Sequence, residues 1–184
     1  MSKKRFISQF FSEKKQIGAI SPSSRFLADK MLENITFSKA NVIVELGPGT
    51  GVFTQKILEQ IEPNATLLVF ELNNDFFKQL SSSIKDQRVI LIHDSAEKLN
   101  HYLLKHNISE VDYVVSSLPL SNFPLRFILR LLRAMQGTLS QEGKFIQFQY
   151  SLQSKKTIEH VFKSVSISFT PLNIPPAFVY TCSR

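Results

Sequence analysis

Short apolar runs alternate along the chain with longer segments in which apolar residues recur at helical spacing. The runs are almost continuous, and β-branched residues are frequent in them. Such runs indicate strands buried on both faces, as parallel strands are when helices cover both sides of a sheet. The pattern predicts strands at 42–46, 67–71, 89–92, 111–115 and 143–150.

Helices are expected between these strands, at 24–34, 52–60, 74–84, 97–106, from Pro124 onward and at 155–162. In the first helix Phe26, Leu27 and Met31 should face inward. Two final strands, 164–171 and 177–182, are joined by a segment short enough for a hairpin. We therefore predict an α/β fold with a Rossmann-like sheet of seven strands, mostly parallel with an antiparallel last strand, and with helices on both faces.

The first 17 residues have an amphipathic pattern. On a helical wheel one arc is apolar and most polar and basic side chains lie opposite; the arc holds Phe6, Ile7, Phe10, Phe11 and Ile17. Such a helix lies in a bilayer interface, with its lysines toward anionic head groups. The alternative is a helix that packs on its own domain. We assign residues 1–34 to amphipathic and substrate-lid helices and residues 35–184 to the main domain.

The net charge of +7 is concentrated near the N-terminus. Residues 1–30 carry seven Lys and Arg against Glu13 and Asp29, a net charge of +5. A basic leader on a nearly neutral domain indicates an anionic partner, either a phospholipid surface or nucleic acid. The alternative is a solvated basic tail.

The composition excludes several classes of protein. A chain of 184 residues with 43% apolar content fits one domain with a full core. No apolar run could span a bilayer and no signal peptide is present, so we expect a cytoplasmic protein, peripheral on the inner face of the membrane. The single cysteine, Cys182, excludes an internal disulfide, and the four histidines lack metal-ligand spacing, so no metal is expected.

A glycine-rich loop follows the first strand, which ends near Glu45. Its spacing is Gly47-x-Gly49-x-Gly51, one residue shorter than the dinucleotide fingerprint. Glycines there bring backbone N–H groups close to a ligand at the start of a helix. This form resembles the first motif of class I S-adenosylmethionine-dependent methyltransferases. The alternative is a dehydrogenase-like or cofactor-free α/β domain.

Carboxylates follow the next two strands directly. Glu71 lies twenty residues after Gly51, where such folds place an acid that accepts from both ribose hydroxyls. Asp94 follows the third strand and precedes Ser95 and Ala96; in a methyltransferase an acid here accepts from the adenine amino group. Asp94 is also a candidate N-cap for the helix that follows.

The acceptor is expected beside the loop 116–124, which follows the fourth strand. The end of the fifth strand should deliver Tyr150 to the same rim. Ser23, Ser24 and Arg25 suit either a phosphate site or a helix cap. A basic stripe, Arg126, Arg130 and Arg133, is more typical of a solvated helix face.

Five motifs resemble those of the bacterial phospholipid N-methyltransferases, which convert phosphatidylethanolamine to phosphatidylcholine. They lie at 18–25, 44–51, 116–120, 147–150 and 175–180, so with the amphipathic leader the resemblance covers nearly the whole chain. It implies that S-adenosylmethionine is bound by Glu45, Gly47, Gly49, Gly51, Glu71, Asp94, Ser95, Ala96 and Ser116. It also implies that the phospholipid head group meets the leader, Ser23, Ser24, Arg25, Tyr150 and Tyr180, with Tyr150 orienting the amine as the catalytic candidate.

The chain also resembles ribosomal RNA adenine dimethyltransferases, whose fourth motif reads Asn-Leu-Pro-Tyr. There the amide holds the adenine amino group and the ring stacks on the base. Ser117 and Leu120 occupy those positions here and can do neither. We therefore expect a lipid rather than a nucleic acid as partner and no obligate protein partner. Another amine acceptor and a membrane-bound, non-catalytic cofactor-binding protein remain alternatives.

Overall fold

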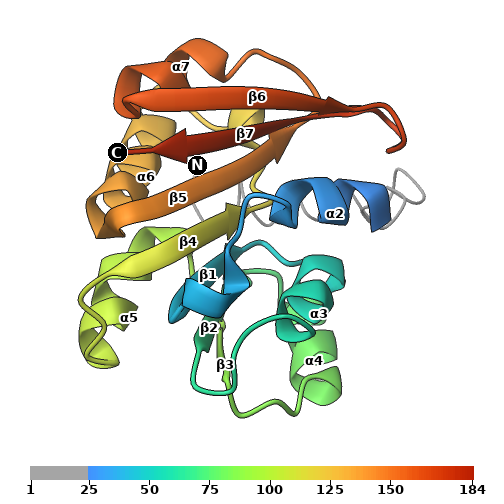
Figure 1. The fold of residues 1–184 in the computed structure, drawn as a ribbon, viewed down its shortest axis with the longest axis vertical. Coiled ribbons are helices and arrows are strands. Elements are labelled where there is room, and N and C mark those ends of the chain that lie inside the picture. The colour runs from blue at the N-terminus through green and yellow to red at the C-terminus, as the bar shows by residue number, and fades with distance from the viewer. Residues whose placement is uncertain (1–24) are drawn as a thin grey trace.

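The computed structural model describes residues 25–184, and their strands form one seven-stranded sheet in the order β3-β2-β1-β4-β5-β7-β6 (Figure 1). The strands are β1 Val42–Leu46, β2 Thr66–Phe70, β3 Val89–Ile92, β4 Val111–Ser116, β5 Leu139–Gln149, β6 Ser164–Thr170 and β7 Ala177–Ser183. The α-helices are α2 Arg25–Leu32, α3 Val52–Leu58, α4 Asn74–Ser83, α5 Leu99–Lys105, α6 Leu125–Thr138 and α7 Lys155–Val161. Short 3-10 turns are η1 Phe37–Lys39, η2 Ala96–Lys98 and η3 Leu120–Asn122.

The strand directions confirm the predicted Rossmann-like sheet. Strands β1 to β5 pair in parallel, whereas β7 is antiparallel to both β5 and β6. The last two strands form the expected hairpin. The carboxyl ends of β1 to β5 and β6 therefore point the same way, toward what we call the carboxyl edge of the sheet.

Strand β5 begins earlier than predicted. The sequence placed its start at Gly143, but Leu139 already pairs with Val111 of β4. Helix α6 ends at Thr138 and passes into β5 without a loop, and a bulge between Val111 and Tyr113 adjusts the register. The prediction therefore omitted the first four residues of the strand, 139–142.

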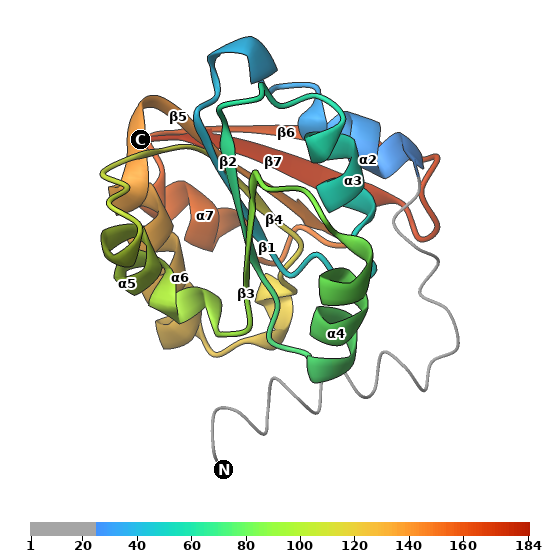
Figure 2. The same ribbon diagram turned by 90° about the horizontal axis from the view of Figure 1, so that it is seen from below.

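Helices cover both faces of the sheet, as predicted. Figure 2 shows α5, α6 and α7 on one side and α2, α3 and α4 on the other. Each face has its own buried apolar cluster: Leu131, Phe145 and Tyr180 belong to one, and Leu27 and Phe53 to the other. The strands are apolar on both faces because each face is covered.

Helix α2 packs in the core of the domain. Leu27, Ala28 and Met31 are fully buried in the same cluster as the strands. The prediction that Phe26 faces inward is wrong, because Phe26 lies at the solvent side of the first turn and is 56% exposed. The boundary placed after residue 34 thus does not separate α2 from the sheet. The division otherwise stays a prediction, since the leader with Ser23 and Ser24 lies outside the described residues.

The connections place a binding site at the carboxyl edge. From β1 the chain moves outward through β2 to β3 and then crosses back to β4 on the other side of β1. The loops after β1 and β4 therefore diverge, and ligands of open α/β sheets bind in the resulting crevice. Among residues 25–184 no helix is long and apolar enough to cross a membrane.

Candidate active site

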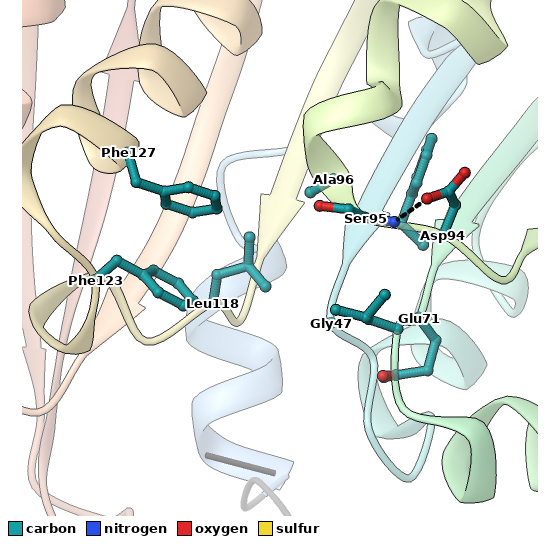
Figure 3. Close-up of a pocket in the computed structure, with 10 residues that line it drawn as sticks. Gly47, Glu71, Asp94, Ser95, Ala96, Leu118, Phe123 and Phe127 are labelled. Carbon is teal, nitrogen blue, oxygen red and sulfur yellow. Dashed lines mark hydrogen bonds between the residues drawn. The ribbon is translucent and has the colours of Figure 1, made fainter. Parts of the chain in front are cut away.

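A pocket of about 390 Å³ opens at the carboxyl edge, where β1, β2, β3 and β4 end. Figure 3 shows two walls that face one another. The polar wall is formed by Gly47, Glu71, Asp94, Ser95 and Ala96, and the apolar wall by Leu118, Phe123 and Phe127. Phe70 and Leu72 complete the lining. Five of the predicted cofactor residues are thus brought together from three separate loops.

The glycine loop contributes Gly47 to the lining of the pocket, and Gly49 follows in the same loop. Gly47 has a φ of +70°, and a Cβ atom there would lie 3.1 Å from Cδ2 of Leu118. Gly49 has a φ of +59° and open space around its missing side chain. A side chain at either position would be strained and would narrow the approach to the backbone. The loop is therefore shaped for close contact with a ligand.

Glu71 is fixed by the loops around it. Its side chain is 1% exposed, with Oε2 accepting from the N–H of Gly49 at 3.1 Å and Oε1 accepting from the N–H of Asn73 at 2.7 Å. Each carboxylate oxygen can accept more than one hydrogen bond. This arrangement suits the predicted contact with a ribose.

Asp94 lies on the same wall of the pocket as Gly47. Its Oδ1 accepts from the N–H of Ser95 at 2.7 Å, and its Oδ2 accepts from the hydroxyl of Tyr102 at 3.3 Å. The N-cap of η2 is Ser95, whose Oγ accepts from the N–H of Glu97. The capping role considered for Asp94 is therefore wrong, and its carboxylate is held at the edge of the pocket by the N–H of Ser95 and the hydroxyl of Tyr102.

Glu45 does not line the pocket but lies beneath the glycine loop. It is fully buried, and its Oε2 accepts from the hydroxyl of Thr54 at 2.6 Å. Burial is the main cause that raises its pKa from 4.5 to about 8, and the hydrogen bond from Thr54 opposes that rise only in part. The carboxyl is thus mostly neutral at pH 7. Glu45 was predicted to bind S-adenosylmethionine together with the glycine loop. In the structure it supports that loop from below.

Two other predicted cofactor residues also support the pocket from behind. Gly51 caps α3 with a φ of +86°, and its N–H donates to the carbonyl oxygen of Pro48 at 3.0 Å. Ser116 is 1% exposed at the end of β4, where its Oγ accepts from the N–H of Leu118 at 3.3 Å. Both residues set the course of the loops rather than the surface of the pocket.

The apolar character of this wall was not predicted, although Leu118 and Phe123 belong to the acceptor loop predicted at 116–124. Phe127 lies four residues after Phe123, and their ring centroids are 4.9 Å apart. This helical spacing from the end of the predicted loop was a signal that could have identified Phe127. Because α6 begins at the carboxyl edge, its first turn presents these rings to the pocket (Figure 3).

Two buried glutamines hold the acceptor loop. The side-chain amides of Gln147 and Gln149 both donate to the carbonyl oxygen of Leu118, at 3.0 and 2.9 Å. These residues belong to a motif that carried the family resemblance, but no role followed from their sequence. Alternation along β5 places both on one face of the strand, so they reach the same carbonyl.

The predicted head-group residues that the structure describes do not gather in the pocket. Tyr180 is fully buried at mid-strand in β7, packed in the core on the side of α6 and α7, so its predicted contact with substrate is wrong. Burial raises its pKa to about 12. Tyr150 follows β5, packs edge-on against Phe148 and does not line the pocket. Burial raises the pKa of Tyr150 as well, against a hydrogen bond with Asn173.

The predicted basic residues also lie apart from the pocket. Arg25 is exposed at the start of α2 and lines a separate groove with Thr50 and Lys56. The stripe on α6 is exposed, as predicted, and Arg130 pairs with Glu97. Among residues 25–184 no cluster of His, Cys, Asp or Glu could hold a metal ion.

Comparisons with known proteins point to methyltransferases. The model of the ribosomal RNA adenine dimethylase family matches residues 10–163. An ornithine lipid N-methyltransferase from Singulisphaera acidiphila is 30% identical over 179 residues, 96% of this chain and 93% of that protein. A ribosomal RNA small subunit methyltransferase A from Clostridium botulinum is 26% identical over 121 residues, 65% of this chain and 42% of that protein.

Among solved structures, a precorrin-6y C5,15-methyltransferase from Geobacter metallireducens has a TM-score of 0.72 at 12% identity. The match covers 90% of this chain and 92% of that one. At this level of identity the likeness shows the fold alone.

Proposed function

Since the chain belongs to the ribosomal RNA adenine dimethylase family and is an S-adenosylmethionine-dependent N-methyltransferase, we propose that its acceptor is the amine of a membrane lipid head group. The predicted enzyme class and cofactor are confirmed by this membership. The acceptor predicted from the sequence was phosphatidylethanolamine. The relative that matches nearly the whole chain is named for an ornithine lipid, and both lipids offer an amine.

The observation that carries the proposal is the position of Leu120. In enzymes that methylate a base, an aromatic ring at this position of the motif stacks on that base. Leu120 is not in the pocket at all: it is fully buried in the core beside α6. The pocket is closed on that side by Leu118, Phe123 and Phe127, which offer no hydrogen bond to a base edge. A flexible lipid amine does not need such hydrogen bonds from this wall.

The polar wall suits the cofactor. Glu71 would accept from the ribose hydroxyls and Asp94 from the adenine amino group, while Gly47 and Gly49 let the backbone approach the rest of the molecule. When bound, the cofactor supplies an electrophilic methyl group. The residues of this wall then hold that group in place opposite the apolar wall.

The apolar wall suits the amine. A primary amine resembles that of lysine, with a pKa of about 10.4 in water, so it is protonated at neutral pH and cannot attack. Apolar surroundings disfavour the charged form. Phe123 and Phe127 would exclude water from the reacting nitrogen and then stabilise the methylated cation through their ring faces.

Loss of the proton does not require a protein base. No histidine or carboxylate belongs to the apolar wall of this pocket in the described part of the chain. The raised pKa of Tyr150 keeps its hydroxyl protonated, so it is a poor base. The proton would leave to water or to an acidic group of the lipid itself.

Methylation of RNA is the second candidate, since the family is named for that activity and a second relative shares it by name. Labelled S-adenosylmethionine offered with phosphatidylethanolamine vesicles, ornithine-lipid vesicles and total RNA separates the candidates. We expect label in at least one lipid and none in RNA. Label in RNA alone would reverse the assignment, and Gly49→Val, which should not bind the cofactor, serves as the inactive control.

The leader is part of the proposal. Removing residues 1–17 should abolish vesicle binding and lipid methylation while affinity for S-adenosylhomocysteine stays nearly unchanged, because the pocket residues lie elsewhere. Vesicle co-sedimentation and calorimetry measure the two properties separately. A truncated protein that methylates vesicle lipid at the full rate would remove the leader from the mechanism.

A further inference from the structure

Exposed apolar side chains gather at the carboxyl edge of the sheet. Among residues 25–184, every large apolar residue that is strongly exposed lies at this edge, except Leu104 near the end of α5. Five of them surround the tip of the β6–β7 hairpin, and we call them the hairpin patch: Phe26, Leu152, Phe169, Leu172 and Ile174. Figures 1 and 2 both show the start of α2 beside this tip and α5 on the far side of the molecule.

At the hairpin tip a polar residue is buried and its apolar neighbours are exposed, the reverse of the usual arrangement. Asn173 is 3% exposed and donates from Nδ2 to the carbonyl oxygen of Pro175 at 2.6 Å. Its neighbours Leu172 and Ile174 are 62% and 81% exposed. A polar residue thus holds the loop from within while two large apolar side chains project outward. Apolar groups presented together in this way indicate a contact surface.

Another part of the edge is tied to the same tip. Tyr150, which follows β5, forms a hydrogen bond with the side chain of Asn173. This bond links the segment that carries Leu152 to the hairpin, so the two loops present one surface. Phe169 is also held there, with its ring 5.2 Å from that of Phe178.

The loops that frame the patch carry basic residues and no acidic ones, while Asp29 in α2 and Glu159 in α7, which pairs with Lys155, lie on the adjoining helices. Segments 117–127, 150–157 and 169–178 form this half of the edge and contain no Asp or Glu. Their charged residues are Arg126, Lys155 and Lys156, and Arg25 begins α2 beside the hairpin. Apolar side chains framed by cations fit an anionic lipid surface, where rings and aliphatic groups enter the interface and cations meet head groups.

We propose that the hairpin patch docks on an anionic phospholipid bilayer, with Leu172 and Ile174 entering the head-group region. The inference rests on the proposed function, since docking at this edge turns the mouth of the pocket toward the lipid amine. It adds a contact made by the folded domain to the one predicted for the leader.

Tryptophan reporters test the docking directly. The chain contains no tryptophan, so Ile174→Trp introduces a single fluorescent probe into the full-length protein. On phosphatidylglycerol vesicles its emission should shift to shorter wavelength and be quenched by brominated acyl chains. Leu104→Trp is the matched control, because Leu104 is 77% exposed but lies away from the patch, and its emission should not change.

Several outcomes would overturn the proposal. One is emission from the Ile174→Trp variant that vesicles leave unchanged while the protein co-sediments with them. Another is an equal response from the Leu104→Trp variant, which would indicate general adsorption. A third is emission from the Ile174→Trp variant that is already shifted without vesicles, which would mean that the patch is covered by the chain's own leader or a second copy.

Serine variants test how much the hairpin patch contributes to vesicle binding and to methylation of vesicle lipid. Leu172→Ser with Ile174→Ser should weaken binding to phosphatidylglycerol vesicles by about tenfold or more, and Leu104→Ser should not. The double variant should lose methylation of vesicle lipid but keep its affinity for S-adenosylhomocysteine and its activity on a short-chain, water-soluble lipid amine. Unchanged vesicle binding by the double variant would refute the docking.

The failures of the two proposals differ. If no lipid amine is methylated but the probe of the Ile174→Trp variant still enters vesicles, the proposed function fails and the membrane surface stands. If lipid is methylated normally while that probe stays in water, the function stands and the docking fails.

Discussion

The carboxyl edge of the sheet has two halves of opposite character. The half at β1, β2 and β3 carries Glu71 and Asp94, whose oxygens are held by backbone N–H groups. The half at β4, β5 and β6 has no acidic residue in its loops and exposes the hairpin patch. A cofactor with hydroxyl and amino groups needs fixed polar partners, whereas a lipid amine needs a dry path from a membrane. The pocket lies where the two halves meet.

The largest expected effect is a loss of cofactor binding caused by a substitution in the glycine loop. Gly49 has a φ of +59°, so Gly49→Val forces a β-branched residue into the left-handed region and fills the space above the loop. Affinity for S-adenosylhomocysteine should fall by at least about 1,000-fold in calorimetry. Gly137→Val, at a glycine of α6 with open space and no positive φ, is the control. A folded Gly49→Val protein with normal affinity would mean that the cofactor binds elsewhere.

The next largest effect is a loss of activity without a comparable loss of cofactor affinity, caused by a substitution in the apolar wall. Phe127→Ser brings a hydroxyl and water to the apolar wall, so kcat/KM for lipid amine should fall about 100-fold. The affinity for S-adenosylhomocysteine should change much less. Leu125→Ser, two residues earlier on the same helix and exposed, should leave both unchanged. Equal losses of cofactor affinity and activity would show that the two walls do not act separately.

A single polar contact should have a smaller effect. Glu71→Ala removes the carboxylate that is expected to accept from the ribose, so binding of S-adenosylhomocysteine should weaken by about 1.5–3 kcal/mol. Calorimetry at constant pH gives the difference. The result would count against the ribose assignment if sinefungin and S-adenosylhomocysteine bound to this variant as well as to the unmodified protein.

The last prediction concerns the stability of the fold rather than binding or activity. Burial raises the pKa of Glu45 to about 8, so the folded protein keeps a proton that the unfolded chain loses near 4.5. The free energy of unfolding should therefore fall between about pH 5 and 8, by up to about 1.4 kcal/mol per pH unit. Glu45→Gln keeps an acceptor for Thr54 but cannot ionise, so it should remove most of this fall in urea titrations. An identical pH profile for both proteins would contradict the raised pKa.

The same comparison explains which parts of the site could be predicted. The cofactor half is local: Gly47, Glu71 and Asp94 each lie at the end of an apolar run, and strand ends of a parallel sheet meet at one edge. The acceptor half depends on which faces of α6 and β7 pack inward, and this packing is not visible at the strand ends. Phe127 lines the pocket because α6 begins at the carboxyl edge. Tyr180 lies in the middle of β7, away from that edge, and its side chain packs in the core.

The sequence by itself determined the order of strands and helices, the glycine loop and the acids that follow β2 and β3, because periodicity and strand ends are local properties. Only the tertiary structure decided which side chains are buried. In the folded protein Phe26 is exposed, and the buried carboxyl of Glu45 is mostly neutral at pH 7. Asn173 is buried, while its neighbours Leu172 and Ile174 are exposed. Burial and pKa depend on what packs against a residue, and those neighbours come from distant parts of the chain.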